Sequence, residues 1–357
     1  MMTSNMRPNR SVLLGALALL PLGALTFSAP ATSALATKRV GASGYHELKK
    51  ISIPGNGGWD YLTVDPAARR LYVARSSHVS VVDIDSDTLV GDIPNTKGVH
   101  GVAIAPKLGK GYTSNGGDNT VTVFDVKTLK EISHIPVGSG PDAIVFEAAS
   151  RRVFTLNGQS GDATAIDTQT GKVVGTLPLG GRPEFAVSDD KGKVYVNIED
   201  KSEIVQIDAQ SLKILNRWPL APGEEPTGLS IDKKRGRLFS VCANKKMVIL
   251  DTASGKVIGS PTIGDGPDAS AFDPGTGLAI SSNGEGNLTL VQTGSGADFP
   301  VAATVATQPG ARTMALDPKT HRIYLAAAKS LPPAPGETNP RRRGYVPGSF
   351  VILVYGK

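Results

Sequence analysis

The chain has 357 residues, a formal net charge of +6, one cysteine and a hydrophobic fraction of 40%. Its charges are scattered apart from Arg341-Arg342-Arg343, so composition disfavours nucleic acid as a partner. Because Cys242 is the single cysteine, the chain can form no internal disulfide, and the sequence has no CxxCH site for haem. We therefore expect a domain held together by its hydrophobic core.

Residues 1–36 have the pattern of a secretory signal peptide. Arg7 and Arg10 precede the apolar run SVLLGALALLPLGALTF, and Ala34-Leu35-Ala36 predicts cleavage after Ala36. Pro21 and Gly23 interrupt the apolar run, so we expect no stable membrane insertion. The sequence thus predicts an exported protein, periplasmic or secreted. A short segment at 37–44 would precede a folded domain at 45–357.

That domain is built from a unit that recurs every 40–44 residues. The successive units begin with GGWDYLTVD, GVHGVAIAP, GPDAIVFEA, RPEFAVSDD, EPTGLSIDK, GPDASAFDP and GARTMALDP. One position in this alignment is occupied in turn by Asp60, His100, Asp142, Glu184, Thr227, Asp268 and Arg312. Repeats of this length with four short strands are typical of β-propeller blades.

The third unit illustrates the expected strands. They cover Asp142–Glu147, Val153–Asn157, Asp162–Asp167 and Val173–Leu179, with a turn at Gly171 before the last strand. The apolar residues run in short bursts instead of alternating with polar ones. This pattern favours blades that are packed against neighbours on both faces.

The two ends of the domain indicate how the ring closes. The last unit finishes with its third strand, within Ser349–Lys357, and lacks a fourth. Tyr45–Gly55 resembles Thr128–Gly138, which contains a fourth strand, and would complete the last blade. The fold class expected is therefore all-β: a seven-bladed β-propeller of four-stranded blades, closed by its N-terminal strand.

At this point the sequence resembles a known family. LYVARSS (Leu71–Ser77), VYVNIED (Val194–Asp200) and IYLAAAK (Ile323–Lys329) are similar to the Tyr-Val-Thr-Asn repeat of the YVTN-type (YncE-like) β-propeller proteins. The resemblance extends over essentially the whole mature chain and implies the propeller fold. It implies no single activity, because such propellers include binding scaffolds and some enzymes.

A candidate binding site follows from the geometry of a propeller. The first strand of each blade lines the central channel, so the recurring position lies on the channel rim. The residues that we expect to bind a ligand there are Trp59, Asp60, His100, Asp142, Glu184, Asp268 and Arg312. A second set approaches the same face from the ends of the second strands, and from it we add Asn115, Asn157 and Asn283 to the expected ligand-binding residues.

Turn chemistry offers an alternative reading of these residues. Aspartate after Gly-Pro and asparagine before glycine often bond to nearby backbone amides, and a pattern that repeats in every blade fits that role. His100, Glu184 and Arg312 are poor turn formers at the same position, so the rim is diversified as a binding surface would be.

Two functions remain open at this stage. We expect first a module that binds a small molecule or a protein at the channel face, without covalent chemistry. The alternative is a lactonase-like hydrolase or lyase, in which Asp60, His100, Asp142, Glu184 and Asp268 hold Ca²⁺, Mg²⁺, Mn²⁺ or Zn²⁺. A quinone-cofactor dehydrogenase is disfavoured, because the chain has no vicinal cysteines and only two tryptophans.

Two further expectations complete the reading. The insertion at 329–349 is rich in proline and arginine, so we expect a loop on the rim face. This loop either covers the acidic channel rim or is simply solvated. We also expect a monomer.

Overall fold

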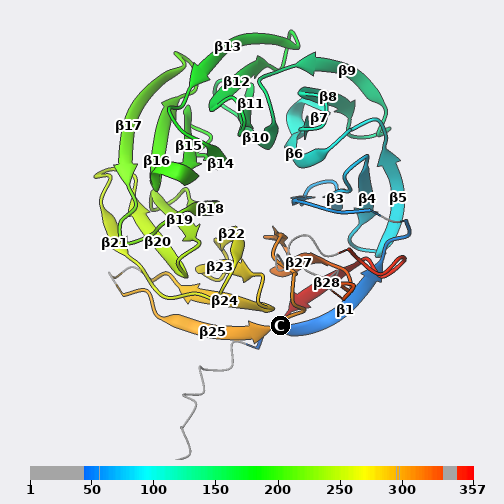
Figure 1. Cartoon of the computed structure of the whole chain (residues 1–357), viewed down its shortest axis with the longest axis vertical. Helices are drawn as coiled ribbons and strands as arrows, with labels where there is room; N and C mark the ends of the chain where they lie inside the picture. Colours follow the sequence, from blue (N-terminus) through cyan, green and yellow to red (C-terminus); the bar gives the residue numbers. More distant parts are fainter. Residues whose placement is uncertain (1–43, 56, 295, 297, 333–343) are drawn as a thin grey trace, which may run out of the picture. The chain divides into compact units, whose positions relative to one another are not determined.

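A computed structural model describes residues 44–55, 57–294, 296, 298–332 and 344–357. Its strands form seven four-stranded antiparallel sheets arranged as blades of one ring (Figure 1). In six of the blades the strand nearest the centre comes first in the chain and the outermost strand comes last. The expected seven-bladed β-propeller is confirmed.

The blades are numbered here in chain order from the first complete one. Blades 1 and 2 contain β2 (Leu62–Asp65), β3 (Arg70–Ala74), β4 (Val79–Asp83), β5 (Thr88–Ile93), β6 (Val99–Ala105), β7 (Lys110–Asn115), β8 (Thr120–Asp125) and β9 (Glu131–Pro136). Blades 3 and 4 contain β10 (Pro141–Glu147), β11 (Arg152–Asn157), β12 (Asp162–Asp167), β13 (Lys172–Pro178), β14 (Pro183–Ser188), β15 (Lys193–Ile198), β16 (Glu203–Asp208) and β17 (Lys213–Pro219). Blades 5 and 6 contain β18 (Pro226–Asp232), β19 (Arg237–Cys242), β20 (Lys246–Asp251), β21 (Val257–Gly259), β22 (Pro267–Asp273), β23 (Leu278–Asn283), β24 (Asn287–Gln292) and β25 (Val301–Ala306).

Blade 7 joins the two ends of the chain. It contains β26 (Met314–Asp317), β27 (Arg322–Ala327), β28 (Val351–Gly356) and, as its outer strand, β1 (His46–Ser52). β1 runs antiparallel to β28, with Ser52 opposite Val351 and His46 opposite Gly356. The N-terminal strand therefore closes the ring, as the sequence predicts, and β28 keeps no unpaired edge.

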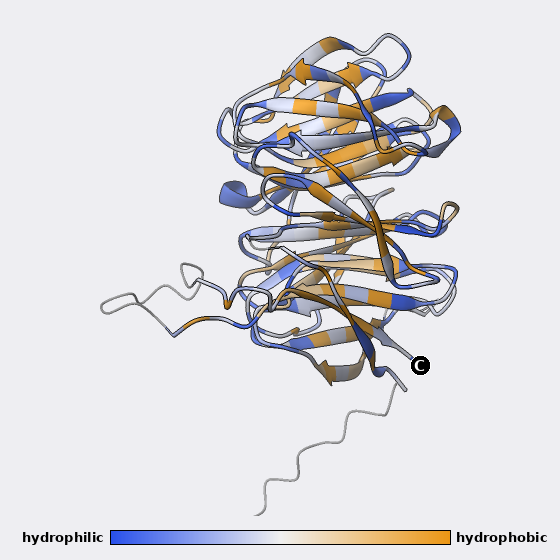
Figure 2. Ribbon diagram, turned by 90° about the vertical axis from the view of Figure 1, so that its right-hand side faces the viewer, coloured by the Kyte–Doolittle hydropathy of each residue, from blue (hydrophilic) through white to orange (hydrophobic). Residues whose placement is uncertain are grey.

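The hydrophobic core lies mainly between blades. Between blades 7 and 1, for example, Ile352 and Tyr324 pack with Leu71 and Val82, all fully buried. The second and third strands of each blade are buried on both faces, which explains their continuous apolar runs. Figure 2 shows the hydrophobic colour concentrated in the strands, with hydrophilic residues frequent in the loops at both ends of the blades.

Helical structure is minor in the described part of the chain. It consists of two single 3₁₀ turns, η1 (Pro106–Leu108) and η2 (Glu199–Lys201). No described helix has the length and apolar character needed to span a membrane.

Candidate functional site at the channel rim

In blades 2 to 6 an irregularity at the start of the first strand places the rim residue. The pairing of β6 with β7 shifts between Val99 and Gly101, and that of β10 with β11 shifts between Pro141 and Ile144. His100 and Asp142 lie within these shifts, where an interrupted ladder redirects a side chain. The Ser114 hydroxyl, in blade 2, donates to the carbonyl of Asp142 in blade 3 and so links the two irregular segments.

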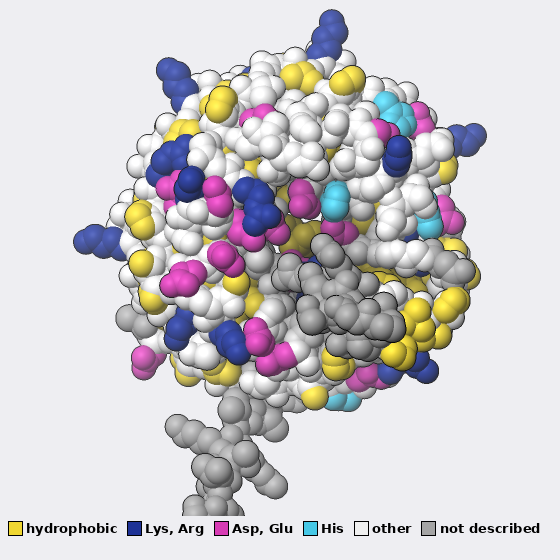
Figure 3. Space-filling model, in the orientation of Figure 1, with side chains coloured by type: hydrophobic (Ala, Val, Ile, Leu, Met, Phe, Trp, Pro, Cys, Tyr) yellow, Lys and Arg dark blue, Asp and Glu magenta, His cyan; other side chains and the backbone are white. Residues whose placement is uncertain are grey.

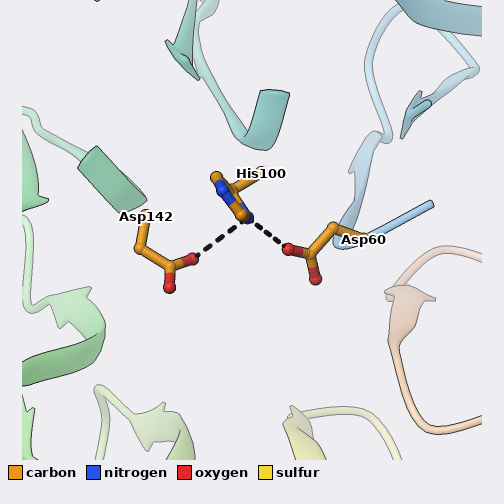
Figure 4. Close-up of side chains that lie close together, drawn as sticks. All are labelled: Asp60, His100 and Asp142. Atoms are coloured by element: carbon orange, nitrogen blue, oxygen red, sulfur yellow. Dashed lines mark hydrogen bonds and ion pairs between the residues drawn. The ribbon is translucent and has the colours of Figure 1, made fainter. Parts of the chain in front are cut away.

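Three rim side chains from successive blades meet (Figure 4). His100 Nδ1 lies 2.6 Å from Asp60 Oδ2 and 3.7 Å from Asp142 Oδ1, so the imidazole stands between the two carboxylates. One nitrogen and two oxygens of these residues lie within 4.8 Å of one another. All three side chains are partly exposed, at 26–38% of their full accessibility, so a ligand can reach them.

Gly116 makes room for the His100 ring. A Cβ at Gly116 would lie 2.8 Å from His100 Nε2 and 3.3 Å from the Pro141 carbonyl oxygen. The equivalent glycine of blade 3, Gly158, has its nearest such neighbour at 3.7 Å, which is ordinary contact. A side chain at position 116 would therefore press against the His100 ring, whereas a Cβ at position 158 of blade 3 would make only ordinary contacts.

Glu184 extends the acidic cluster into blade 4. Burial, followed by the negative charges of Asp142, Glu199 and Asp268, raises the pKa of the Glu184 carboxyl well above its usual value. Burial likewise raises the pKa of Asp142 to about 6, against the opposing effect of His100. The hydrogen bond to Asp60 raises the pKa of His100, which burial alone would lower. These carboxyls therefore hold protons more tightly than exposed ones do.

The remaining charges of the rim are paired. Arg312 Nε lies 3.1 Å from Asp268 Oδ2, and Arg182 forms an ion pair with Glu199. Asp268 and Glu199 thus each have an arginine partner, whereas Asp60 and Asp142 flank His100, and the charge of Asp142 also acts on Glu184. The balance on that side of the rim is negative whenever these carboxyls are ionised.

Two aromatic side chains meet beneath the rim. Tyr61 of blade 1 and Phe185 of blade 4 have ring centroids 4.7 Å apart, and each directly follows a rim residue. Buried Tyr61 also donates a hydrogen bond to the Asp268 carbonyl oxygen at 3.1 Å. Figure 3 looks onto the rim, where acidic side chains and a histidine border a central hollow on one side. We call the region with Asp60, His100, Asp142 and Glu184 at its edge and the Tyr61–Phe185 contact beneath them the cup.

The three asparagines expected at this face have their side chains inside the blades. Asn115, Asn157 and Asn283 are fully buried. Each amide nitrogen donates to side chains of the third strand in its own blade, as Asn157 does to Asp162 and Thr164. Each amide oxygen accepts from a hydroxyl two residues earlier. These contacts tie the second strand to the third, so the candidate site described here omits the three asparagines.

Trp59 lies beside the cup and packs against the base of the long insertion. Its ring centroid is 4.5 Å from that of Tyr345 and 5.2 Å from that of Phe350. Arg75, which follows the second strand of blade 1, is buried with its guanidinium carbon 3.8 Å from the Phe350 ring centroid. Most of the insertion, 333–343, and the expected signal peptide lie outside the described residues.

The single cysteine and the second tryptophan have structural roles. Cys242 is buried and free, and burial raises the pKa of its thiol to about 12, so it is not poised for thiolate chemistry. Trp218 packs in the outer strand of blade 4 with its ring stacked 6.1 Å from that of Tyr195.

The sequence interpretation missed Tyr61, Phe185 and Gly116. The signal for the two aromatic residues was present, because the residue after the rim position is aromatic in only two units and small in Gly101, Ala143, Gly228, Ala269 and Thr313. For Gly116 the sequence carries no signal, since Asn-Gly occurs at the same point in blades 2, 3 and 6.

The donor set at Asp60, His100 and Asp142 can hold a divalent ion in principle. One imidazole nitrogen and two carboxylate oxygens suit Zn²⁺ or Mn²⁺, with Glu184 and water as further oxygen donors. The raised pKa of His100 opposes this, because a metal binds the neutral imidazole. Metal affinity at this site would therefore increase as the pH rises.

Comparison with known proteins finds similar solved structures. No family model matches the chain, and no curated protein matches it. A propeller in hydrazine synthase of Kuenenia stuttgartiensis superposes with a TM-score of 0.68 at 18% identity, covering 77% of this chain and 94% of that one. U3-55K gives 0.72 at 9% identity (86% and 98%), and a chain of the mitotic checkpoint complex gives 0.70 at 14% (86% and 96%). At these identities the likeness shows the fold alone.

Proposed function

We propose that this chain is a binding module that holds a positively charged ligand in the cup at the channel rim. The observation that carries the proposal is the convergence of Asp60, His100, Asp142 and Glu184 above the contact of Tyr61 with Phe185. Carboxylates attract a cation, and the faces of Tyr61 and Phe185 would favour its apolar or cationic part. A small molecule or a lysine or arginine of a partner protein has the required chemistry.

The crowding of carboxyls supports a ligand at this position. Burial first, and then the charges of neighbouring carboxylates, raise the pKa values of Asp142 and Glu184, so ionising these groups costs free energy in the folded chain. A bound cation relieves the repulsion, so part of the binding free energy comes from the strain of the empty cup. Functional sites commonly contain such perturbed groups.

A divalent-metal-dependent hydrolase or lyase is the second candidate. It is favoured by the one nitrogen and two oxygens within 4.8 Å at Asp60, His100 and Asp142. A metal there would polarise a substrate carbonyl, and Glu184, whose pKa is raised, would hold or donate a proton nearby. We also propose that the protein is exported and related to YVTN-type propellers, on the basis of residues 1–36 and the Tyr-Val motifs of the second strands.

Metal analysis and thermal unfolding test both candidates. The purified mature protein is analysed for Ca, Mg, Mn and Zn without added ions, and its melting temperature is measured with each ion and with arginine and choline. We expect a rise with at least one cation, and we expect His100→Ala with Glu184→Ala to abolish it while the melting temperature without ligand changes little. A stoichiometric metal would favour the enzyme.

Gly116→Ala provides a control for side-chain deletion. It keeps every ligand atom but displaces the His100 ring, so it should reduce the ligand-induced rise, whereas Gly158→Ala should leave the rise unchanged. A full rise in the His100→Ala, Glu184→Ala protein, or no rise with any cation, would contradict binding in the cup.

A further inference from the structure

A separate cleft of about 500 Å³ opens on the rim face between blades 6 and 7. Its walls come from the loops before the first strands of both blades, the loop after β23, Trp59 and the two described ends of the long insertion. The volume is within the usual range for a site that takes a small organic molecule.

One wall of the cleft is aromatic. Trp59 and Tyr345 both line it, with their ring planes tilted by 46° to each other. Phe350 packs behind Trp59, and Arg75 packs on Phe350, so the indole is held by a stack of buried groups. Tyr345 is 40% exposed although it is a large ring in contact with another. These rings offer a fixed apolar surface at low entropic cost.

The opposite wall combines polar side chains with bare backbone. Asp265, Glu285 and Arg312 line it, and two of these charges are matched: Asp265 pairs with Lys245 at 2.9 Å and Arg312 with Asp268 at 3.1 Å. Gly266, Gly284 and Gly310 complete the wall. A Cβ at Gly284 would lie 3.1 Å from the Gly266 carbonyl oxygen, so this wall stays flat only with glycine there.

The chemistry of the two walls selects the ligand. Arg312 is already paired with Asp268 and Asp265 with Lys245, and Glu285 carries a further negative charge, so the wall disfavours an anion. A neutral polyhydroxyl ring avoids that penalty and can bond to all three side chains. Its C–H face would cover an aromatic ring, and its hydroxyls would donate to the carboxylates and accept from the guanidinium.

We propose that this cleft binds a neutral saccharide, with one sugar ring against Trp59 and Tyr345 and its hydroxyls on Asp265, Glu285 and Arg312. The proposal goes beyond the cation cup, from which it differs in ligand and in all but one of the polar residues. The cup and the cleft share the ion pair of Arg312 with Asp268, so the two sites border each other.

The chain contains a built-in reporter for this cleft, because Trp59 and Trp218 are its only tryptophans. In the Trp218→Phe protein, Trp59 alone reports, and we titrate it with cellobiose, maltose, lactose and chitobiose. We expect a saturable change of emission with at least one disaccharide. The Trp59→Phe protein, in which Trp218 alone reports, should show none. Glucuronate, which is an anion, should bind more weakly than glucose.

Titration calorimetry on the chain that keeps both tryptophans provides a second measurement of the disaccharide affinity. Tyr345→Ala should weaken the affinity for the active disaccharide by about tenfold or more, since it removes half of the aromatic wall. His100→Ala with Glu184→Ala should leave that affinity unchanged, and Trp59→Phe should leave the cation-induced rise in melting temperature unchanged. Failure of one site is thus distinguishable from failure of the other. Absence of a saturable response to all four disaccharides, or an equal response after Trp59→Phe, would overturn the proposal.

Discussion

At the end of the blades away from the rim, the third strand of blades 1 to 5 finishes with an aspartate that closes its own turn. Asp167 Oδ1, for example, accepts from the amides of Gln169 and Thr170 and from the Thr170 hydroxyl at 2.8–3.0 Å. At the rim, the acids crowd one another instead. Hydrogen bonds from the turn, led by the Thr170 amide, lower the pKa of Asp167, whereas burial raises that of Asp142.

This contrast separates structural carboxylates from candidate functional ones. Asp83, Asp125, Asp167, Asp208 and Asp251 occupy one repeated position with nearly the same bonds, and the pKa of each is lowered by a turn amide. The rim position instead varies from blade to blade. Identical residues with identical local partners indicate a role in folding, while variation with raised pKa values indicates a role in binding.

The largest effect on stability should come from a buried carboxylate at the end away from the rim. Asp317 is fully buried, accepts from Lys319 N and Thr320, and pairs with Arg69 Nη1 of blade 1 at 2.8 Å. Asp317→Ala leaves these donors unsatisfied across the ring closure and should reduce the free energy of unfolding by about 2–4 kcal/mol. The cation-induced rise in melting temperature should persist.

Asp85→Ala is the matched control, because Asp85 binds the same arginine but is 61% exposed. Its cost should stay below about 1 kcal/mol. Denaturant unfolding of both variants gives the comparison. Equal losses would mean that burial does not distinguish the two carboxylates.

The next prediction concerns the pH dependence of stability. The rim carboxyls should destabilise the folded chain as the pH rises, which is opposite to the effect of the turn aspartates. The folded-state pKa of Glu184 is raised, so its contribution to stability is complete below about pH 4.5 and is lost as the pH rises through the folded value. Asp142, with a pKa of about 6, acts in the same direction. Glu184→Gln removes the charge and should stabilise the chain by roughly 1–2 kcal/mol at pH 8, with little change at pH 4.5.

Melting temperatures of both proteins from pH 4 to pH 9 test this prediction. The gap between Glu184→Gln and the parent should open as the pH rises. Asp167→Asn should behave oppositely, because the stabilising effect of a lowered pKa is present at neutral pH and is lost on acidification. A parent that is more stable than Glu184→Gln at pH 8 would show that the Glu184 charge has a partner.

The features that could be predicted from the sequence are those that repeat from blade to blade. The blades and the closing strand follow from a unit of near-constant length, and the structure confirms both. Asn157 could not be assigned, because an asparagine before glycine looks the same whether its amide points into the blade or the channel. Tyr61 of blade 1 contacts Phe185 of blade 4. A sequence repeat predicts contacts between successive strands and blades, but not which side chains meet across the channel.

The smallest effect concerns a single proton. The hydrogen bond between His100 Nδ1 and Asp60 Oδ2 is the leading cause of the raised pKa of His100, with burial acting against it. Asp60→Asn keeps a side chain of the same shape but removes the charge. Burial should then dominate and the pKa of His100 should fall, with Asp142 preventing a larger drop. Titration of the histidine C–H signals by NMR measures the shift, and His78, which faces Asp92 on the outside of blade 1, should not move. If His100 kept its pKa in Asp60→Asn, the general negative field of the rim would be responsible. The cup would then attract cations through its summed charge, and no single pair would hold the imidazole in place.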